Sequence, residues 1–152
     1  MIKKRYQNIP ASYLVLIKDN KVLLSKRFNT GYEDGNYSTV AGHVDIGETF
    51  TQCIIREAKE EAGINLRVKD LEVSHVMHRN SQTDEDNERI DIFFIAKKWD
   101  GKILNREPHK CDDLSWFNLN NLPSNTISYI KQAINCVKNK IYYSEHGWQN
   151  KS

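Results

Sequence analysis

The stretch AGHVDIGETFTQCIIREAKEEAGI, residues 41–64, carries four glutamates, three of them within five residues, in a segment that is otherwise largely apolar. Residues 48–62 are predicted to form a helix, and Gly63 is its expected C-cap, because glycine adopts the left-handed conformation without strain. A helix advances about 100° per residue, so side chains three and four positions apart share a face. Three glutamates then lie on one arc beside an apolar face, namely Glu57, Glu60 and Glu61.

Two explanations of this acidic face are open from spacing alone. The face can simply be solvated, with Arg56 and Lys59 nearby, because charged helix faces are common. It can also hold a cation. Glu57 and Glu61 are like charges four residues apart, which is unfavourable in an ordinary helix, and the preceding Gly42 permits a close backbone approach. Clustered carboxylates beside such a turn suit a hard divalent cation such as Mg²⁺.

The segment resembles the Nudix box of the Nudix hydrolase superfamily. That pattern is Gly, five residues, Glu, seven residues, Arg-Glu, an apolar residue, any residue, Glu-Glu, any residue, Gly and a final apolar residue. Every fixed position is matched, and Ala58 fills an apolar position that more often holds Leu. The matching residues are Gly42, Glu48, Arg56, Glu57, Ala58, Glu60, Glu61, Gly63 and Ile64. The segments on both sides also resemble the family's layout, so the likeness extends over most of the chain.

The resemblance implies hydrolysis of a nucleoside diphosphate linked to another group, X, with Mg²⁺ as cofactor and Mn²⁺ as a substitute. It implies that Glu60 and Glu61 are metal ligands, with the main-chain carbonyl of Gly42 as a further ligand. Glu57 would be a metal ligand or the base that orients the attacking water. The three glutamates form the implied catalytic set, and two other residues of the box would hold the carboxylates in position, namely Glu48 and Arg56.

Positions outside the box suggest further contacts by the same resemblance. Lys26 and Arg27 end a strand where MutT-type members set an arginine near substrate phosphates, and a solvated strand end is the alternative. Glu107 follows WDGKILNR and resembles a loop glutamate that joins the metal site. Asn125 resembles an asparagine that hydrogen-bonds the purine. A helix N-cap is the favoured role for Asn125, because Asn is among the best N-cap residues.

Two departures from the MutT-type box bear on the substrate. His43 replaces a common Lys, and Ala41 replaces the first Gly. His43 is therefore a candidate substrate-binding residue, and MutT substrate preference does not transfer simply. The subgroup marks of ADP-ribose hydrolases, dinucleoside polyphosphate hydrolases and coenzyme A hydrolases are absent. The expected substrate is a nucleoside triphosphate, ordinary or oxidised, which would yield a monophosphate and pyrophosphate.

Other functions stay open beside that expectation. One is Nudix hydrolysis of a nucleotide sugar, a CDP-alcohol or a dinucleoside polyphosphate. Another is a non-catalytic nucleotide-sensing module, although the intact glutamates argue against it. The oligomeric state, monomer or homodimer, is open as well.

Composition narrows the class of protein. The 152 residues suit one domain, expected to span 1–152 with a core at about 10–141. The formal net charge of +2 argues against a nucleic-acid partner. No apolar run is long enough to span a membrane, so no membrane partner is expected. The three cysteines form no paired motif and are expected to be free thiols. Without a secretory signal pattern, the expected location is cytoplasmic.

The apolar pattern outside the box predicts more strands than helices. Strands are expected at 12–27, with a turn at Asp19-Asn20, and at 66–79 and 89–99, whereas 81–88 is an acidic loop and 100–113 is irregular. A second amphipathic helix is predicted over 126–141, and the tail 142–152 carries no clear signal. The predicted fold class is α/β (α+β), a Nudix-type α/β/α sandwich with a central mixed sheet. His75 and His78 fall on opposite strand faces and are not expected to share a metal.

Overall fold

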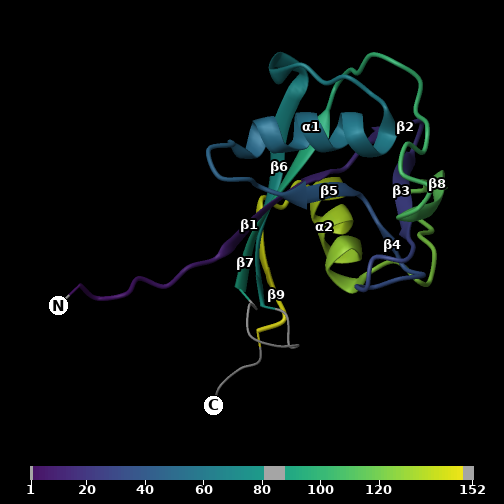
Figure 1. The fold of residues 1–152 in the computed structure, drawn as a ribbon. Coiled ribbons are helices and arrows are strands. Elements are labelled where there is room, and N and C mark those ends of the chain that lie inside the picture. The colour runs from purple at the N-terminus through teal and green to yellow at the C-terminus, as the bar shows by residue number, and fades with distance from the viewer. Residues whose placement is uncertain (1, 81–87, 149–152) are drawn as a thin grey trace.

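A five-stranded mixed sheet forms the centre of the protein in the computed structural model, which describes residues 2–80 and 88–148 (Figure 1). The strand order is β5-β1-β7-β6-β9, with parallel pairing of β1 with β7 and of β6 with β9. These strands are β5 (Val40–His43), β1 (Ile9–Leu14), β7 (Glu88–Ala96), β6 (Leu71–Asn80) and β9 (Tyr143–His146).

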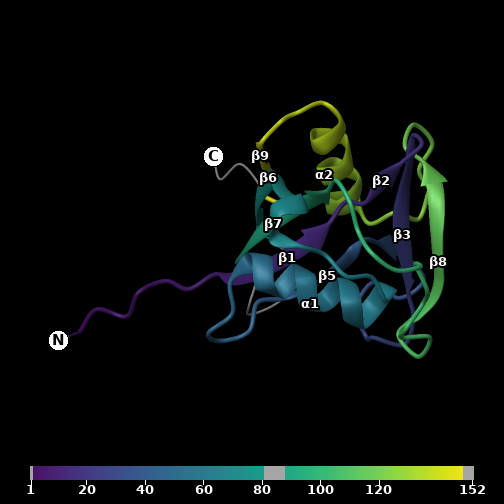
Figure 2. The ribbon, with the colours of Figure 1, turned by 90° about the horizontal axis from the view of Figure 1, so that it is seen from above.

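One helix covers each face of this sheet. Helix α1 (Phe50–Ala62) lies on one side of β1 and β5, and helix α2 (Ser128–Lys138) lies on the other side (Figures 1 and 2). The predicted α/β/α sandwich with a central mixed sheet is therefore confirmed. No helix within the described ranges 2–80 and 88–148 has the length and apolar character needed to cross a membrane.

A second, smaller sheet stands beside the sandwich (Figure 2). In it β3 pairs with β2, β4 and β8, all antiparallel. The turn between β2 and β3 is made by Asp19 and Asn20, both at positive φ, as the turn chemistry predicts. The strands of this sheet are β2 (Ile17–Lys18), β3 (Lys21–Arg27), β4 (Tyr37–Ser38) and β8 (Cys111–Asn118).

Helix α1 begins two residues later than the sequence pattern predicts. Thr49 is its N-cap, and Thr49 Oγ1 accepts a hydrogen bond from the Gln52 amide at 3.1 Å. Gln52 Oε1 accepts in return from the Thr49 amide at 2.9 Å, which completes a capping box. Glu48 therefore lies in the turn before the helix. Gly63 ends the helix at φ 69°, as predicted.

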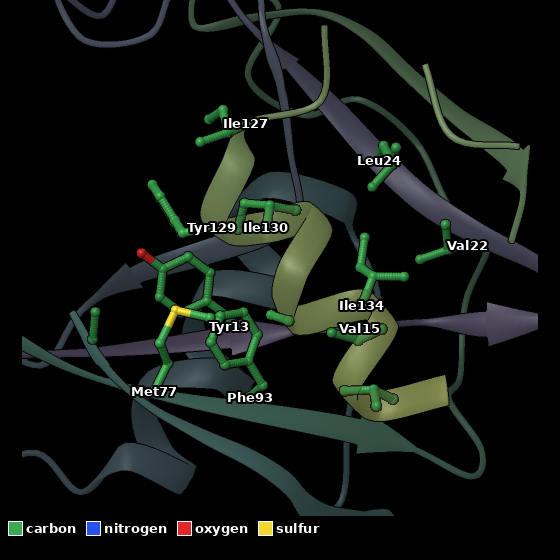
Figure 3. Close-up of a cluster of buried hydrophobic side chains, with 13 residues drawn as sticks. Tyr13, Val15, Val22, Leu24, Met77, Phe93, Ile127, Tyr129, Ile130 and Ile134 are labelled. Carbon is green, nitrogen blue, oxygen red and sulfur yellow. The ribbon is translucent and has the colours of Figure 1, made fainter. Parts of the chain in front are cut away.

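Successive side chains of β1 alternate between the two layers of the core. Tyr13 faces α2 and Leu14 faces α1, because successive strand side chains point to opposite faces. Figure 3 shows the cluster beneath α2, in which Tyr13 stacks on Phe93 with ring centroids 4.6 Å apart. The cluster includes Tyr13, Val15, Val22, Leu24, Met77, Phe93, Ile127, Tyr129, Ile130 and Ile134.

Several element boundaries differ from the sequence prediction. The strand predicted from 66 begins at 71, because Val68–Asp70 forms a 3-10 turn. The segment 100–113 is not irregular to its end, since β8 begins at Cys111 and pairs with β3. The second helix runs from Ser128 to Lys138 and is shorter than the predicted 126–141. Residues 126 and 127 lie before the helix, where Thr126 pairs with Tyr37 of β4. Most of the acidic loop predicted at 81–88 lies outside the described residues.

The tail holds a strand that its sequence does not reveal. Strand β9 runs parallel to β6, and the buried ring of His75 joins it to the sheet. His75 Nδ1 lies 2.6 Å from the Ile141 carbonyl oxygen, and Nε2 lies 2.7 Å from Ser144 Oγ. His78 instead lies beside Trp148, so the two histidines do point apart. The three cysteines are free, and two are buried.

Candidate metal centre and substrate cavity

The acidic face of α1 is turned toward the edge strand β5. Glu61 Oε2 accepts a hydrogen bond from the Ala41 amide at 3.1 Å. Glu57 and Glu61 are half-buried, while Glu60 is exposed. A freely solvated acidic face is therefore wrong for the first two glutamates.

Arg56 ties the carboxylates together. Its Nε and Nη2 donate to the two oxygens of Glu48 at 2.8 and 2.9 Å, in a bidentate pair. Its Nη1 donates to Glu57 Oε1 at 2.7 Å and to Glu60 Oε2 at 3.4 Å. Its Nη2 also donates to the His43 carbonyl at 3.2 Å. One guanidinium thus orients the side chains around the box and anchors them to β5.

These contacts separate the pKa values of the glutamates. Hydrogen bonds from Arg56 lower the pKa of Glu48 to about 2. Burial raises the pKa of Glu61 well above its usual range, and the nearby Glu57 raises it further. Burial also raises the pKa of Glu57, although Arg56 acts in the opposite direction. At Glu57 and Glu61 burial therefore outweighs the charge that compensates it, whereas both oxygens of Glu48 are paired with Arg56.

Gly42 is required by the packing of Glu57 rather than by an unusual backbone angle. A Cβ at this position would lie 2.0 Å from Glu57 Oε1 and 2.2 Å from Glu57 Cδ. Any side chain here would displace the Glu57 carboxylate from the edge of β5.

We expect Gly42→Ala to lower turnover by about 100-fold or more, because a displacement of about 1 Å at a reacting group can cost that much. The fold should survive, since the side chain of Glu57 can move away. Steady-state kinetics and a thermal melt of the same preparation measure both effects. Wild-type turnover in Gly42→Ala would show that the position of Glu57 does not matter.

One cavity of about 590 Å³ collects most of the residues that the sequence singles out. The predicted residues on its wall are Lys26, Arg27, Gly42, His43, Glu57, Glu60, Glu61 and Glu107. Glu107 lines the same cavity and adds to the negative potential at Glu57 and at Glu61, and its contact with a metal ion stays a prediction. The side chains of Lys26, Arg27 and Lys110 bring positive charge to the same cavity.

Arg27 also organises the loop that follows β3. Its Nε donates to the Tyr32 carbonyl at 2.7 Å, and its Nη2 donates to Thr30 Oγ1 at 3.1 Å. The guanidinium carbon lies 5.3 Å from the centre of the Tyr32 ring. Asp34 closes the loop by accepting from the Thr30 and Gly31 amides. The arginine is therefore a fixed part of the cavity wall and not a solvated strand end.

Asn125 does not cap helix α2. Ile127 holds the N-cap position, without a side-chain cap. Asn125 Nδ2 instead donates to the Gly35 carbonyl at 2.8 Å, and the Asn125 carbonyl accepts from the Tyr37 amide at 2.9 Å. The N-cap prediction is wrong because Asn125 lies in a turn, closed by a hydrogen bond from the Thr126 amide to the Pro123 carbonyl, two residues before the N-cap Ile127. The predicted contact of Asn125 with a base stays a prediction.

The inner end of the cavity was not foreseen from the sequence. It is lined by Tyr13, Arg79, Arg89 and Tyr129, from β1, β6, β7 and α2. Arg79 Nε donates to the buried Asp91 at 2.7 Å, and its guanidinium carbon lies 3.8 Å from the centre of the Tyr129 ring. Local patterns do not bring these residues together. An arginine among the inward positions of β6 was the one available signal.

The donor set at the outer end fits a hard divalent cation. Four carboxylates line the cavity, and carboxylate oxygens are ligands that Mg²⁺ prefers. The raised pKa values of Glu57 and Glu61 mark carboxylates that added positive charge would stabilise. Across residues 2–80 and 88–148, no three His, Cys, Asp or Glu side chains are already gathered closely enough to hold an ion. The fit therefore rests on ligand chemistry and on the shared cavity.

Cation binding should stabilise the folded protein. At a concentration about 100 times the dissociation constant, Mg²⁺ would add about 2.7 kcal/mol to the free energy of unfolding. That corresponds to a rise of about 5–10 °C in melting temperature for a chain of this size. Thermal melts in EDTA and in Mg²⁺ measure the shift. An equal shift in Glu61→Gln would place the ion elsewhere.

Known proteins share the sequence pattern and the fold of this chain. A sequence model of the NUDIX domain matches residues 8–134 of this chain. The chain belongs to the Nudix family. The match includes all of the box and the loop that carries Glu107.

Relatives of this Nudix protein act on more than one substrate, as their names state. It is 31% identical over 114 residues to the NAD-capped RNA hydrolase NudC of Vibrio atlanticus (strain LGP32), covering 75% of this chain and 39% of that protein. It is 34% identical over 109 residues to the ADP-ribose pyrophosphatase of Methanocaldococcus jannaschii, covering 72% of this chain and 61% of that protein. The chain thus spans about two fifths of the length of the NudC relative.

Solved structures share the fold of this Nudix protein. The crystal structure of a MutT NUDIX hydrolase from Burkholderia pseudomallei superposes with a TM-score of 0.77 at 24% identity. The match covers 86% of this chain and 98% of that one. This likeness concerns the fold alone.

Proposed function

We propose that this Nudix protein hydrolyses a phosphoanhydride bond in a nucleoside diphosphate linked to another group, with Mg²⁺ as cofactor and Mn²⁺ as a substitute. One observation carries the proposal: four carboxylates and five cationic side chains line the same cavity. Negative ligands for a cation and positive partners for phosphate are both needed for this reaction.

The residues of the cavity have different roles in this reaction. Glu60 and Glu61 hold the cation, with the Gly42 carbonyl beside them. Glu57, whose carboxylate packs against Gly42, either joins them or orients the attacking water. Lys26 and Arg27 bind the phosphate oxygens. When bound, the cation neutralises phosphate charge and lowers the pKa of a bound water.

Glu48 and Arg56 act through these groups. The bidentate pair fixes the guanidinium, and Arg56 Nη1 then holds Glu57 Oε1 at 2.7 Å. Such support keeps the carboxylate in position before substrate arrives, which is the main requirement of phosphoryl transfer.

A nucleoside triphosphate is the first candidate substrate. It would be cleaved to a nucleoside monophosphate and pyrophosphate. The positive charge of Lys26, Arg27 and Lys110 along the cavity wall supports a substrate that carries several phosphates.

A linked diphosphate such as NAD or ADP-ribose is the second candidate. The names of the NudC and ADP-ribose pyrophosphatase relatives favour it. The cavity also reaches past the glutamates to the aromatic side chains of Tyr13 and Tyr129, which leaves room for more than a phosphate chain.

The test is a hydrolysis assay in Mg²⁺ with chromatographic separation of the products. The panel contains nucleoside triphosphates, 8-oxo-dGTP, NAD, ADP-ribose, dinucleoside polyphosphates and nucleotide sugars. Monophosphate and pyrophosphate from a triphosphate would favour the first candidate, and AMP from NAD or ADP-ribose would favour the second. Turnover that is unchanged by EDTA would contradict the proposal for either.

A further inference from the structure

The inner end of the cavity is lined by Ala11 and by charged side chains that differ from those at the glutamates. On the face of the sheet turned toward α2, Ala11 lies between His43 of β5 and Asp91 of β7. Because alanine has a short side chain, this position leaves space between two strands that carry large polar groups. Arg89 stands two residues before Asp91 on the same face and lines the cavity with His43.

The two arginines at this end differ in how they are paired. Arg79 is buried and compensated, since its Nε donates to the Asp91 carboxylate and its Nη2 lies 3.3 Å from the Tyr13 hydroxyl. Arg89 makes its contact with an imidazole, because its Nη1 lies 2.9 Å from His43 Nε2. A guanidinium can only donate, so this nitrogen of His43 is the acceptor. The pair therefore carries one positive charge that the imidazole does not neutralise.

Arg89 also has a donor without an acceptor. Its Nε is buried and makes no hydrogen bond. Buried donors almost always have a partner, and one without a partner is unfavourable. An oxyanion is the ligand that would use it best, because Nε and a neighbouring Nη together match two oxygens of a phosphate.

We propose that Arg89 and His43, above Ala11, form a subsite for a phosphate group of the substrate that lies outside the cleaved anhydride. The subsite rests on the proposed function, since it needs a nucleotide whose anhydride lies at the glutamates. Two kinds of substrate would supply such a phosphate. One is the terminal phosphate of a triphosphate, and the other is a monoester on a sugar of a linked diphosphate.

Calorimetric titration of the full chain in Mg²⁺ tests the subsite with two matched pairs of nucleotides. The first pair is AMP and adenosine 2′,5′-bisphosphate, which differ by one monoester. The second pair is the α,β-methylene forms of ADP and ATP, which differ by a terminal phosphate. The methylene group prevents cleavage between their α- and β-phosphates. The added phosphate should tighten binding by about tenfold or more in one pair, because charge-assisted bidentate contacts are strong.

Arg89→Gln should remove this tightening, and Arg89→Lys should restore part of it, because lysine keeps the charge without the fork. Arg67→Gln is the matched control, since Arg67 is exposed and pairs with Asp70 away from the cavity. A thermal melt checks that each variant is folded. The pair of nucleotides whose affinity difference depends on Arg89 shows which kind of phosphate the subsite binds.

The outcomes separate the subsite from the proposed function. Tightening that is absent, or equal in wild type and Arg89→Gln, would overturn the subsite even if hydrolysis is normal. Loss of hydrolysis on the whole substrate panel, with Arg89-dependent tightening preserved, would contradict the proposed function and leave the subsite in place.

Discussion

Glu61→Gln is expected to lower turnover by about 1,000-fold, the largest change we expect from a single substitution at the site. The substitution replaces a carboxylate by a neutral amide of nearly the same shape. The Ala41 amide can still donate to the remaining oxygen, so packing against β5 should persist. The loss would therefore come from the missing negative charge and not from a change of fold.

A substitution of the same type provides the control. Glu72 on β6 is exposed, pairs with Lys97 at 3.8 Å and does not line the cavity. Glu72→Gln should keep wild-type turnover in the same steady-state assay. If Glu61→Gln kept it as well, the cluster on α1 would not be the catalytic centre.

Arg79→Met should lower the free energy of unfolding by about 3–5 kcal/mol, the range for removing one partner of a buried ion pair. Asp91 is fully buried, and Arg79 Nε donates to its Oδ2 at 2.7 Å. Burial already raises the pKa of Asp91, although Arg79 opposes that shift. Without the guanidinium, the carboxylate would be left without its counter-ion, and Tyr129 would lose the cation over its ring.

Urea denaturation of the wild type, of Arg79→Met and of a double variant measures this change in the free energy of unfolding. The double variant Arg79→Met/Asp91→Leu removes both charges and should recover a large part of the stability that the single variant loses. A loss of less than about 1 kcal/mol in Arg79→Met would show that the pair is as weak as an exposed one.

The part of this protein that the sequence predicts best is the part fixed by local rules. The helix and its end follow from apolar spacing and from Gly63, whose left-handed conformation few other residues adopt. The carboxylate arc follows from helix geometry, and the structure places Glu57 and Glu61 together against β5. The helix start was two residues off because Thr49 and Gln52 form a capping box that the glutamate pattern obscured.

The remaining features depend on contacts between distant parts of the chain. Strand β9 is four residues long, and its pairing with β6 and its contact with His75 join residues more than sixty positions apart. Asn125 was expected to start a helix, but its backbone is held by Tyr37 of β4. Arg79 and Arg89 become neighbours only through the pairing of β6 with β7. Periodicity along one segment carries no information about such pairs.

Binding of Mn²⁺, a paramagnetic substitute for Mg²⁺, measured by electron paramagnetic resonance, tests the central claim most directly. Titration of the wild type and of Glu61→Gln reports the free ion, independently of any substrate. The proposed site predicts saturable binding in the wild type and a dissociation constant at least about tenfold weaker in Glu61→Gln. Equal affinity in the two proteins, or no saturable binding in the wild type, would contradict a cation site at the glutamates of α1.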